Sequence, residues 1–269
     1  MCIRDSPSVD PEIKYSCRRF KGKVVKQWEA SSFSRLVSGR GYRMELPDRD
    51  APSLQGEPKG GLALNGRHSI VDFPKGIQAG NFFHELFETL DFSSQTSLSY
   101  EALVQDKLCR YGFEGFWKEP VCQTITRVLS MPLTTDLNRV FLLGLDPSQR
   151  LNEMAFSFPA AGLSLSRLQN IFTLYSRSNL PKSFLDKLGQ LDLIHGDTLM
   201  KGFIDLIFQR DGRYYLIDWK SNFLGSHLED YSQTALTQAM DREWYFLQYH
   251  LYVVALHRHL TFRLPNYDY

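Results

Sequence analysis

The segment that decides the fold runs from residue 202 to residue 220 and reads GFIDLIFQRDGRYYLIDWK. It holds two apolar runs rich in strand-forming residues, 202–208 and 214–219, separated by Asp211 and Gly212. Aspartate followed by glycine is preferred in a two-residue type I′ turn, because both positions need a positive φ angle. The sequence therefore predicts a tight antiparallel β-hairpin.

A two-residue turn fixes which residues face each other across the hairpin. Arg210 then pairs with Arg213, and the same register places Asp205 opposite Asp218, with Cβ atoms about 4.5–5.5 Å apart. Two carboxylates facing each other between apolar strands repel, and a divalent cation between them reverses the sign of that interaction. Lys220 lies two residues beyond Asp218 and is expected on the same face of the strand.

This combination is what metal-dependent cleavage of phosphodiesters needs. Carboxylate oxygens bind Mg²⁺, which lowers the pKa of a bound water and neutralises the phosphate. The ammonium of Lys220 can orient the nucleophile or offset the charge that grows on the phosphorane. The alternative is a structural hairpin in which Lys220 simply pairs with Asp218.

The rest of the chain has the pattern of a mixed α/β protein. Residues 153–158 alternate like a strand, and Ser31-Ser32 can cap a short helix. Gly80 or Asn81 is a suitable cap for the first long helix. Apolar residues recur at helical spacing over 82–91, 99–131, 163–189 and 231–260.

The 269 residues allow one or two domains at about 150 residues each. Residues 1–6 are interpreted as a non-native artefact of an assembled fragment. Residues 7–76 are interpreted as the end of a preceding domain and a linker, because 38–76 are rich in Gly, Pro and Asp without periodicity. Residues 77–269 form the predicted α/β domain, which we expect to be truncated at its C-terminus within a longer protein.

The composition and charge of the chain exclude some classes of function. The 31 Lys+Arg and 30 Asp+Glu give a formal charge of +1, so nucleic acid binding needs a local site rather than an overall cationic field. The longest apolar runs, such as 251–256, are too short to span a bilayer. The four cysteines are scattered and form no C-x-x-C pair, which favours a cytoplasmic location.

Two histidines are further candidates. His84 lies at the edge of the apolar face of the 82–91 helix, where it can face a cleft or be an ordinary surface residue or a satisfied core contact. The sequence His84-Glu85-Leu86-Phe87-Glu88 is one ligand short of the zinc-protease motif H-E-x-x-H. His195 and Asp197 are close neighbours on a predicted loop and are a weaker candidate.

Gln248 and Tyr252 are four residues apart and so share one face of a predicted helix. An amide and a phenol there can hold a DNA backbone or a catalytic water. They can equally be the polar tips of a half-buried helix, and the spacing alone favours neither interpretation.

Taken together, these residues resemble the RecB-family nuclease domain of the PD-(D/E)xK, restriction-endonuclease-like superfamily. The resemblance extends from about Ser31 to Tyr269. It implies a restriction-endonuclease-like α/β core, with a small mixed β-sheet flanked by helices, at the C-terminal end of a longer helicase–nuclease chain. The matching motifs occur in order and are Gly80-x-x-x-His84, Glu153 opening a strand, Gly202-Phe203-Ile204-Asp205, Asp218-Trp219-Lys220 and Gln248-x-x-x-Tyr252.

The resemblance also implies roles for these residues. His84, Asp205 and Asp218 would bind one or two Mg²⁺ ions together with the backbone carbonyl of Trp219, and Asp205, Asp218 and Lys220 would be catalytic. Gln248 and Tyr252 would line the DNA site, and Glu153 would be a peripheral residue without an assigned role.

The activity implied is that of a Mg²⁺-dependent deoxyribonuclease, both exonuclease and endonuclease and similar to exodeoxyribonuclease V, in recombinational repair of double-strand breaks. The implied partners are DNA, mainly single-stranded, RecC-like and RecD-like subunits, and helicase domains of the same full-length chain, with no membrane. One alternative is a catalytically silent nuclease-like module that docks a partner or guides DNA. Another is a metal-dependent phosphatase acting on small phosphate esters.

Overall fold

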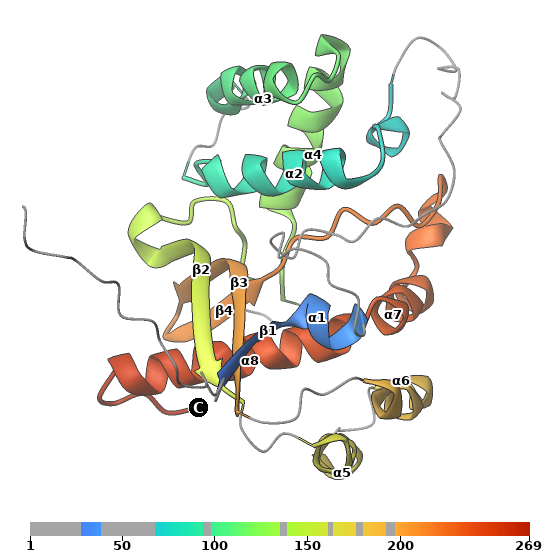
Figure 1. Ribbon diagram of the computed structural model, residues 1–269. Coiled ribbons are helices and arrows are strands. Elements are labelled where there is room, and N and C mark those ends of the chain that lie inside the picture. The colour runs from blue at the N-terminus through green and yellow to red at the C-terminus, as the bar shows by residue number, and fades with distance from the viewer. Residues whose placement is uncertain are drawn as a thin grey trace, which may run out of the picture.

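Figure 1 shows a computed structural model of the chain, which describes residues 28–38, 68–93, 98–134, 139–160, 164–175, 180–191 and 197–269. Its strands are β1 (Trp28–Ser32), β2 (Arg150–Pro159), β3 (Asp197–Arg210) and β4 (Arg213–Ile217). Its helices are α1 (Phe33–Ser38), α2 (Ile77–Thr89), α3 (Leu98–Arg110), α4 (Lys118–Ser130), α5 (Leu165–Tyr175), α6 (Lys182–Lys187), α7 (Gln233–Arg242) and α8 (Tyr245–Arg263). The fold is mixed α/β, as predicted.

The strands form one mixed sheet in which β3 pairs with all three others. β2 runs antiparallel along one edge of β3. On the other edge, β1 pairs in parallel with the first part of β3 and β4 pairs antiparallel with its last part. This arrangement places β3, the strand that carries Asp205, at the centre of the sheet.

The register predicted for the hairpin is confirmed from the turn as far as Leu206 and Ile217, where the ladder ends, so the predicted Asp205–Asp218 pair is not part of it. Arg210 pairs with Arg213 and Leu206 with Ile217, while Asp211 and Gly212 have φ angles of 50° and 73°, both positive as a type I′ turn requires. The second strand ends at Ile217, two residues earlier than expected. The physical reason is local. The backbone N–H of Trp219 donates its hydrogen bond to the side chain of Asp205 at 2.6 Å, instead of to the backbone of β3.

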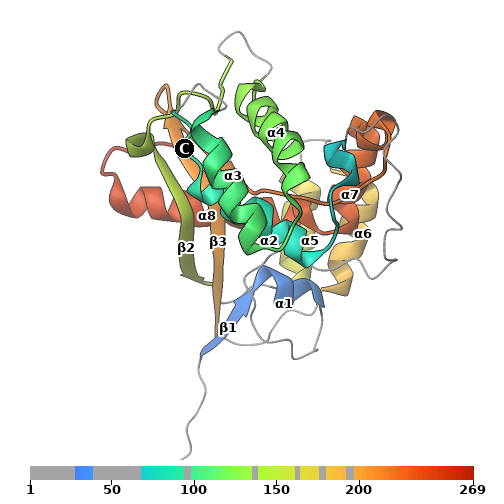
Figure 2. The ribbon, with the colours of Figure 1, turned by 90° about the horizontal axis from the view of Figure 1, so that it is seen from above.

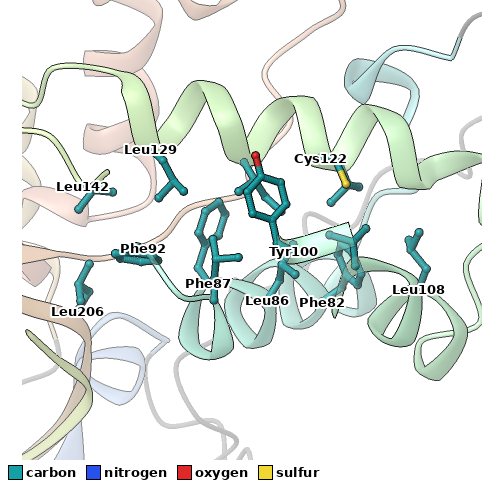
Figure 3. Close-up of a cluster of buried hydrophobic side chains, with 14 of the residues drawn as sticks. Phe82, Leu86, Phe87, Phe92, Tyr100, Leu108, Cys122, Leu129, Leu142 and Leu206 are labelled. Carbon is teal, nitrogen blue, oxygen red and sulfur yellow. The ribbon is translucent and has the colours of Figure 1, made fainter. Parts of the chain in front are cut away.

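Helices cover both faces of the sheet. α2 lies against one face with α3 and α4 outside it, and α8 crosses the other face, as Figures 1 and 2 show. The first core joins α2, α3 and α4 to the sheet, and Figure 3 shows Leu206 of β3 at one end of it. Phe82 and Leu86 of α2 are completely buried in this core. α2 is therefore fixed on the strand that holds Asp205.

Two smaller cores lie on the α8 side. One packs the sheet against α8, with Ile204 and Ile207 of β3 meeting Leu256. The other joins α1, α5 and α6 to the beginning of α8. None of the described helices has the length and apolar character needed to cross a bilayer.

Several helices have different ends from those expected. α2 begins at Ile77 rather than after Gly80 or Asn81, because Gly76 supplies the positive φ angle of 108° that starts the helix. The regions 99–131, 163–189 and 231–260, in which helical spacing was expected, each contain two α-helices. Ser32 caps α1 as expected, since its Oγ accepts the N–H of Arg35 at 3.3 Å.

The sheet also includes residues that precede position 77. β1 pairs with β3, and Phe33 and Leu36 of α1 are buried in a core with α8. Residues 28–38, which belong to the 7–76 segment, are thus an integral part of the fold. Residues 1–27 and 39–67 lie outside the described residues, so the division into domains stays a prediction. His195 also lies outside the described residues.

A buried ion pair joins α2 to α3. Lys107 is 4% exposed, and its Nζ lies 2.5 Å from Oε1 of Glu85. Arg110 contacts the same oxygen at 2.8 Å, and the hydroxyl of Tyr111 donates to Oε2 at 2.5 Å. The hydrogen bond from Lys107, followed by that from Tyr111, lowers the pKa of Glu85. The carboxylate is therefore more stable as an anion in the folded protein.

Replacing Glu85 by glutamine is expected to lower the free energy of unfolding at pH 7 by about 2 kcal/mol, because Lys107 stays buried without its anion. A lowered folded pKa gives stabilisation that is complete above the unfolded value, about 4.3, and is lost as the pH falls through the folded value. The difference between wild type and Glu85→Gln in urea unfolding should therefore shrink between pH 5 and pH 3. Glu229→Gln, at an exposed position, is the control, and an unchanged difference at both pH values would contradict the assignment.

Candidate active site

The candidate site lies at the open end of the hairpin, where α2 meets β3. Nδ1 of His84 is 3.3 Å from Oδ2 of Asp205, and the same carboxylate oxygen accepts the N–H of Trp219 at 2.6 Å. Residues of α2, of β3 and of the segment that follows β4 therefore meet at one oxygen atom. This junction connects the first motif residue, on α2, with both halves of the hairpin segment, β3 and the residues after β4.

His84 is buried, with 4% of its surface exposed, which excludes an ordinary surface residue at this edge of the apolar face. His84 is buried because α2 packs flat on the sheet, so that the edge of the apolar face of the helix is covered together with its centre. The carboxylate of Asp205 favours a proton on Nδ1 of the ring. Nε2 is then the ring nitrogen that carries the lone pair, the form in which imidazole binds metals.

Asp218 and Lys220 lie directly after β4 and contact each other. Nζ of Lys220 is 2.8 Å from Oδ2 of Asp218, and the two side chains are 20% and 19% exposed. The predicted placement of both on one face is consistent with this contact. A structural hairpin predicts the same ion pair, so the pair alone does not identify a catalytic site.

Trp219 fixes the segment between these two residues. Its indole ring stacks on Phe87 of α2, with ring centroids 4.5 Å apart and planes inclined by 21°. Phe87 is one helical turn beyond His84, so the same face of α2 contacts both Asp205 and Trp219. The spacing of three residues between His84 and Phe87 is the one sequence signal for this stacking partner.

Glu153 is the fourth residue of β2 and not its first, as was expected, and it lies at a position of backbone strain. Its φ angle is 51°, which is uncommon for a residue other than glycine. The ladder passes from Asn152 opposite Leu206 to Met154 opposite Ile204 without a pair between Glu153 and Asp205. Strain of this kind gathers at functional sites.

The regular alternation of side chains is broken at the same place. Ile204 packs with α8, whereas Leu206, two residues later, packs with α2 on the opposite face. A regular strand would place both on one face. The local distortion of β3 therefore occurs at Asp205 and turns its neighbours to different cores.

Gln248 and Tyr252 share a face of α8, as expected, but both are inside the protein. They are 1% and 2% exposed, and Nε2 of Gln248 donates to the hydroxyl of Tyr252 at 2.9 Å. Tyr252 also meets Phe156 edge to face, with centroids 5.6 Å apart. These residues are not the exposed polar tips of a helix, and their place in a DNA site stays a prediction.

A hard divalent cation fits the chemistry of the donors at this site. Two carboxylates, an imidazole and a backbone carbonyl are suitable ligands for such an ion, and His84 and Asp205 are already adjacent. In the described residues, no three His, Cys, Asp or Glu side chains gather into a recognisable metal-binding group. Asp218 in this conformation contacts Lys220, so the full ligand set stays a prediction.

The chain belongs to the PD-(D/E)XK nuclease superfamily, whose family model matches residues 62–266. This membership confirms the predicted family and agrees with the mixed α/β fold.

Comparison with curated proteins shows which relatives the chain is similar to within this superfamily. The chain is 36% identical over 249 residues to the RecBCD enzyme subunit RecB of Escherichia coli K12, covering 90% of the chain and 20% of that protein. RecB of Haemophilus influenzae is 29% identical over 268 residues, covering 95% of the chain and 21% of the relative. RecB of Mycobacterium tuberculosis H37Rv is 26% identical over 291 residues, covering 96% and 26%. The chain thus spans about a fifth to a quarter of the length of these relatives.

Proposed function

We propose that this chain hydrolyses phosphodiester bonds of DNA in a Mg²⁺-dependent reaction. The observation that carries the proposal is the junction at Asp205, whose Oδ2 contacts both His84 of α2 and the N–H of Trp219. It places His84 and Asp205 beside Trp219, whose two neighbours in the chain are Asp218 and Lys220.

In this proposal His84, Asp205, Asp218 and the backbone carbonyl of Trp219 hold one or two Mg²⁺ ions. The bound metal would supply a water of lowered pKa and neutralise charge on the phosphate. The burial of His84 and the partial burial of both carboxylates keep water away from the ligands and strengthen their attraction for a cation.

Lys220 is the proposed catalytic cation, together with the carboxylates of Asp205 and Asp218. Its ammonium stands at the carboxylate of Asp218, from which it can offset negative charge that develops on the substrate phosphate. The strained Glu153 lies on the neighbouring strand at the level of Asp205 and stays a peripheral residue of the proposed site. Gln248 and Tyr252 are proposed to shape the DNA site from below the sheet.

The similarity to RecB subunits extends the proposal to the context of the reaction. We propose that the nuclease acts mainly on single-stranded DNA delivered by helicase domains of a longer chain and by RecC-like and RecD-like subunits, in recombinational repair of double-strand breaks. A cytoplasmic location belongs to the same proposal. It is supported by the free thiols of Cys109 and Cys122, since reduced cysteines are typical of that compartment.

The test is cleavage of end-labelled single-stranded DNA by the full chain. We expect products with Mg²⁺, none with excess EDTA, and none with Asp205→Asn, whereas Asp186→Asn on the exposed side of α6 should cleave like the wild type. Calorimetric titration with Mn²⁺ should show a saturable site. A silent module would show neither cleavage nor saturable metal binding, and a phosphatase would act on p-nitrophenyl phosphate but not on DNA; either result would overturn the proposal.

A further inference from the structure

Tyr245, the first residue of α8, contacts the segment that carries the proposed catalytic lysine. Nζ of Lys220 lies 4.6 Å from the centroid of the tyrosine ring, and the hydroxyl of Tyr245 donates to Oδ1 of Asn222 at 2.9 Å. An ammonium over an aromatic face is attracted by the ring quadrupole. One side chain therefore binds two residues of the segment that follows β4.

The backbone immediately before Tyr245 is strained. Trp244 has φ 62° and ψ 18°, the left-handed region, where a bulky side chain is a genuine outlier. Trp244 connects α7 to α8, and its backbone conformation therefore sets the position of Tyr245 at the start of α8. Such strain persists only where the surroundings over-determine it, and it gathers at functional sites.

Lys187 of α6 supplies that support. Its Nζ donates to the carbonyls of Asp241 and Arg242, at 2.5 and 3.3 Å, at the end of α7. The same ammonium lies 4.4 Å from the centroid of the Trp244 ring. The turn between α7 and α8 is thereby fixed from outside, and with it the position of Tyr245.

The proposed chemistry explains why the lysine needs a second contact. A lysine side chain is a flexible four-carbon stem with a point charge at its end, and the carboxylate that holds Lys220 belongs to Asp218, itself a proposed metal ligand. An aromatic face attracts the ammonium without competing for the metal. We propose that Tyr245 is a positioning residue that holds the ammonium of Lys220 beside the reacting phosphate, with its own ring fixed by Asn222. This inference rests on the proposed function.

The experiment compares two substitutions at Tyr245 in the full chain. Tyr245→Leu removes the ring face and should lower kcat for cleavage of single-stranded DNA by about ten- to a hundredfold, the scale of a misplaced catalytic group. Tyr245→Phe keeps the ring and should stay within about fivefold of wild type, since it loses only one hydrogen bond. The dissociation constant for the same labelled strand in EDTA should be unchanged in both variants.

Tyr249→Leu is the matched control, because Tyr249 is one turn further along α8 and packs against His250 instead. Thermal unfolding of each variant separates a loss of fold from a loss of positioning. Wild-type kcat in Tyr245→Leu, with Lys220→Ala inactive, would overturn the inference and leave the nuclease proposal standing. An equal fall in Tyr245→Leu and Tyr249→Leu would also overturn it, whereas full activity of Lys220→Ala would overturn both proposals.

Discussion

Lys220→Ala is expected to reduce DNA cleavage by about a hundred- to a thousandfold, the usual effect of removing one preorganised electrostatic contact from a transition state. The ammonium lies 2.8 Å from the carboxylate of Asp218 and is the cation that the hairpin presents at that position. The proposed metal ligands remain in this variant. Mn²⁺ binding measured by calorimetry should therefore persist while the rate of cleavage falls.

Asp218→Ala separates the two roles, because it should lose cleavage and also weaken Mn²⁺ binding. Lys182→Ala, at an exposed lysine of α6, controls for the loss of one positive charge and should cleave at the wild-type rate. Rates are measured on labelled single-stranded DNA with saturating Mg²⁺. A Lys220→Ala protein that cleaves at the wild-type rate would remove the lysine from the mechanism and return the hairpin to a structural role.

Phe82→Ala is expected to have the largest effect on stability, a loss of about 3–5 kcal/mol in the free energy of unfolding. Phe82 has 0% exposure, and its ring meets those of Phe73 and Phe113 at centroid distances of 5.4 Å. Figure 3 shows it between α2 and the helices outside it. Truncation leaves a cavity that the packed rings around it cannot fill.

Phe262→Ala provides the matched control, because the same atoms are removed from a side chain that is 84% exposed. Its effect should stay within about 0.5 kcal/mol. Urea unfolding followed by tryptophan fluorescence measures both variants. Equal destabilisation by the two substitutions would show that the α2 layer contributes no more to stability than the end of α8.

The register of the hairpin could be predicted from the sequence because it depends on two neighbouring residues. Asp211 and Gly212 fix the turn, and the turn fixes every pair up to Leu206 and Ile217. Apolar periodicity likewise indicated most helices. The division of 231–260 into α7 and α8 had no signal, because it depends on a left-handed tryptophan, Trp244, which nothing in the local sequence favours.

The arrangement of the site depends on long-range packing, which local patterns do not contain. The burial of His84 follows from the docking of α2 on the sheet through Phe87 and Trp219, residues 132 positions apart in the sequence. The burial of Gln248 and Tyr252 likewise follows from the packing of α8 on the other face. The motif order identified these residues, but only the tertiary fold shows which are enclosed.

The central position of β3 has a consequence for folding of the chain during its synthesis on the ribosome. β1 and β2 both pair with β3 and not with each other, and β3 begins only at Asp197. At a translation rate of about 5–20 residues per second, β1 must wait about 8–33 s after its own synthesis for its partner. During that interval its hydrogen-bonding edge is open to other nascent chains. Correct assembly therefore depends on keeping β1 unpaired until residues 197–201 of β3 have been synthesised.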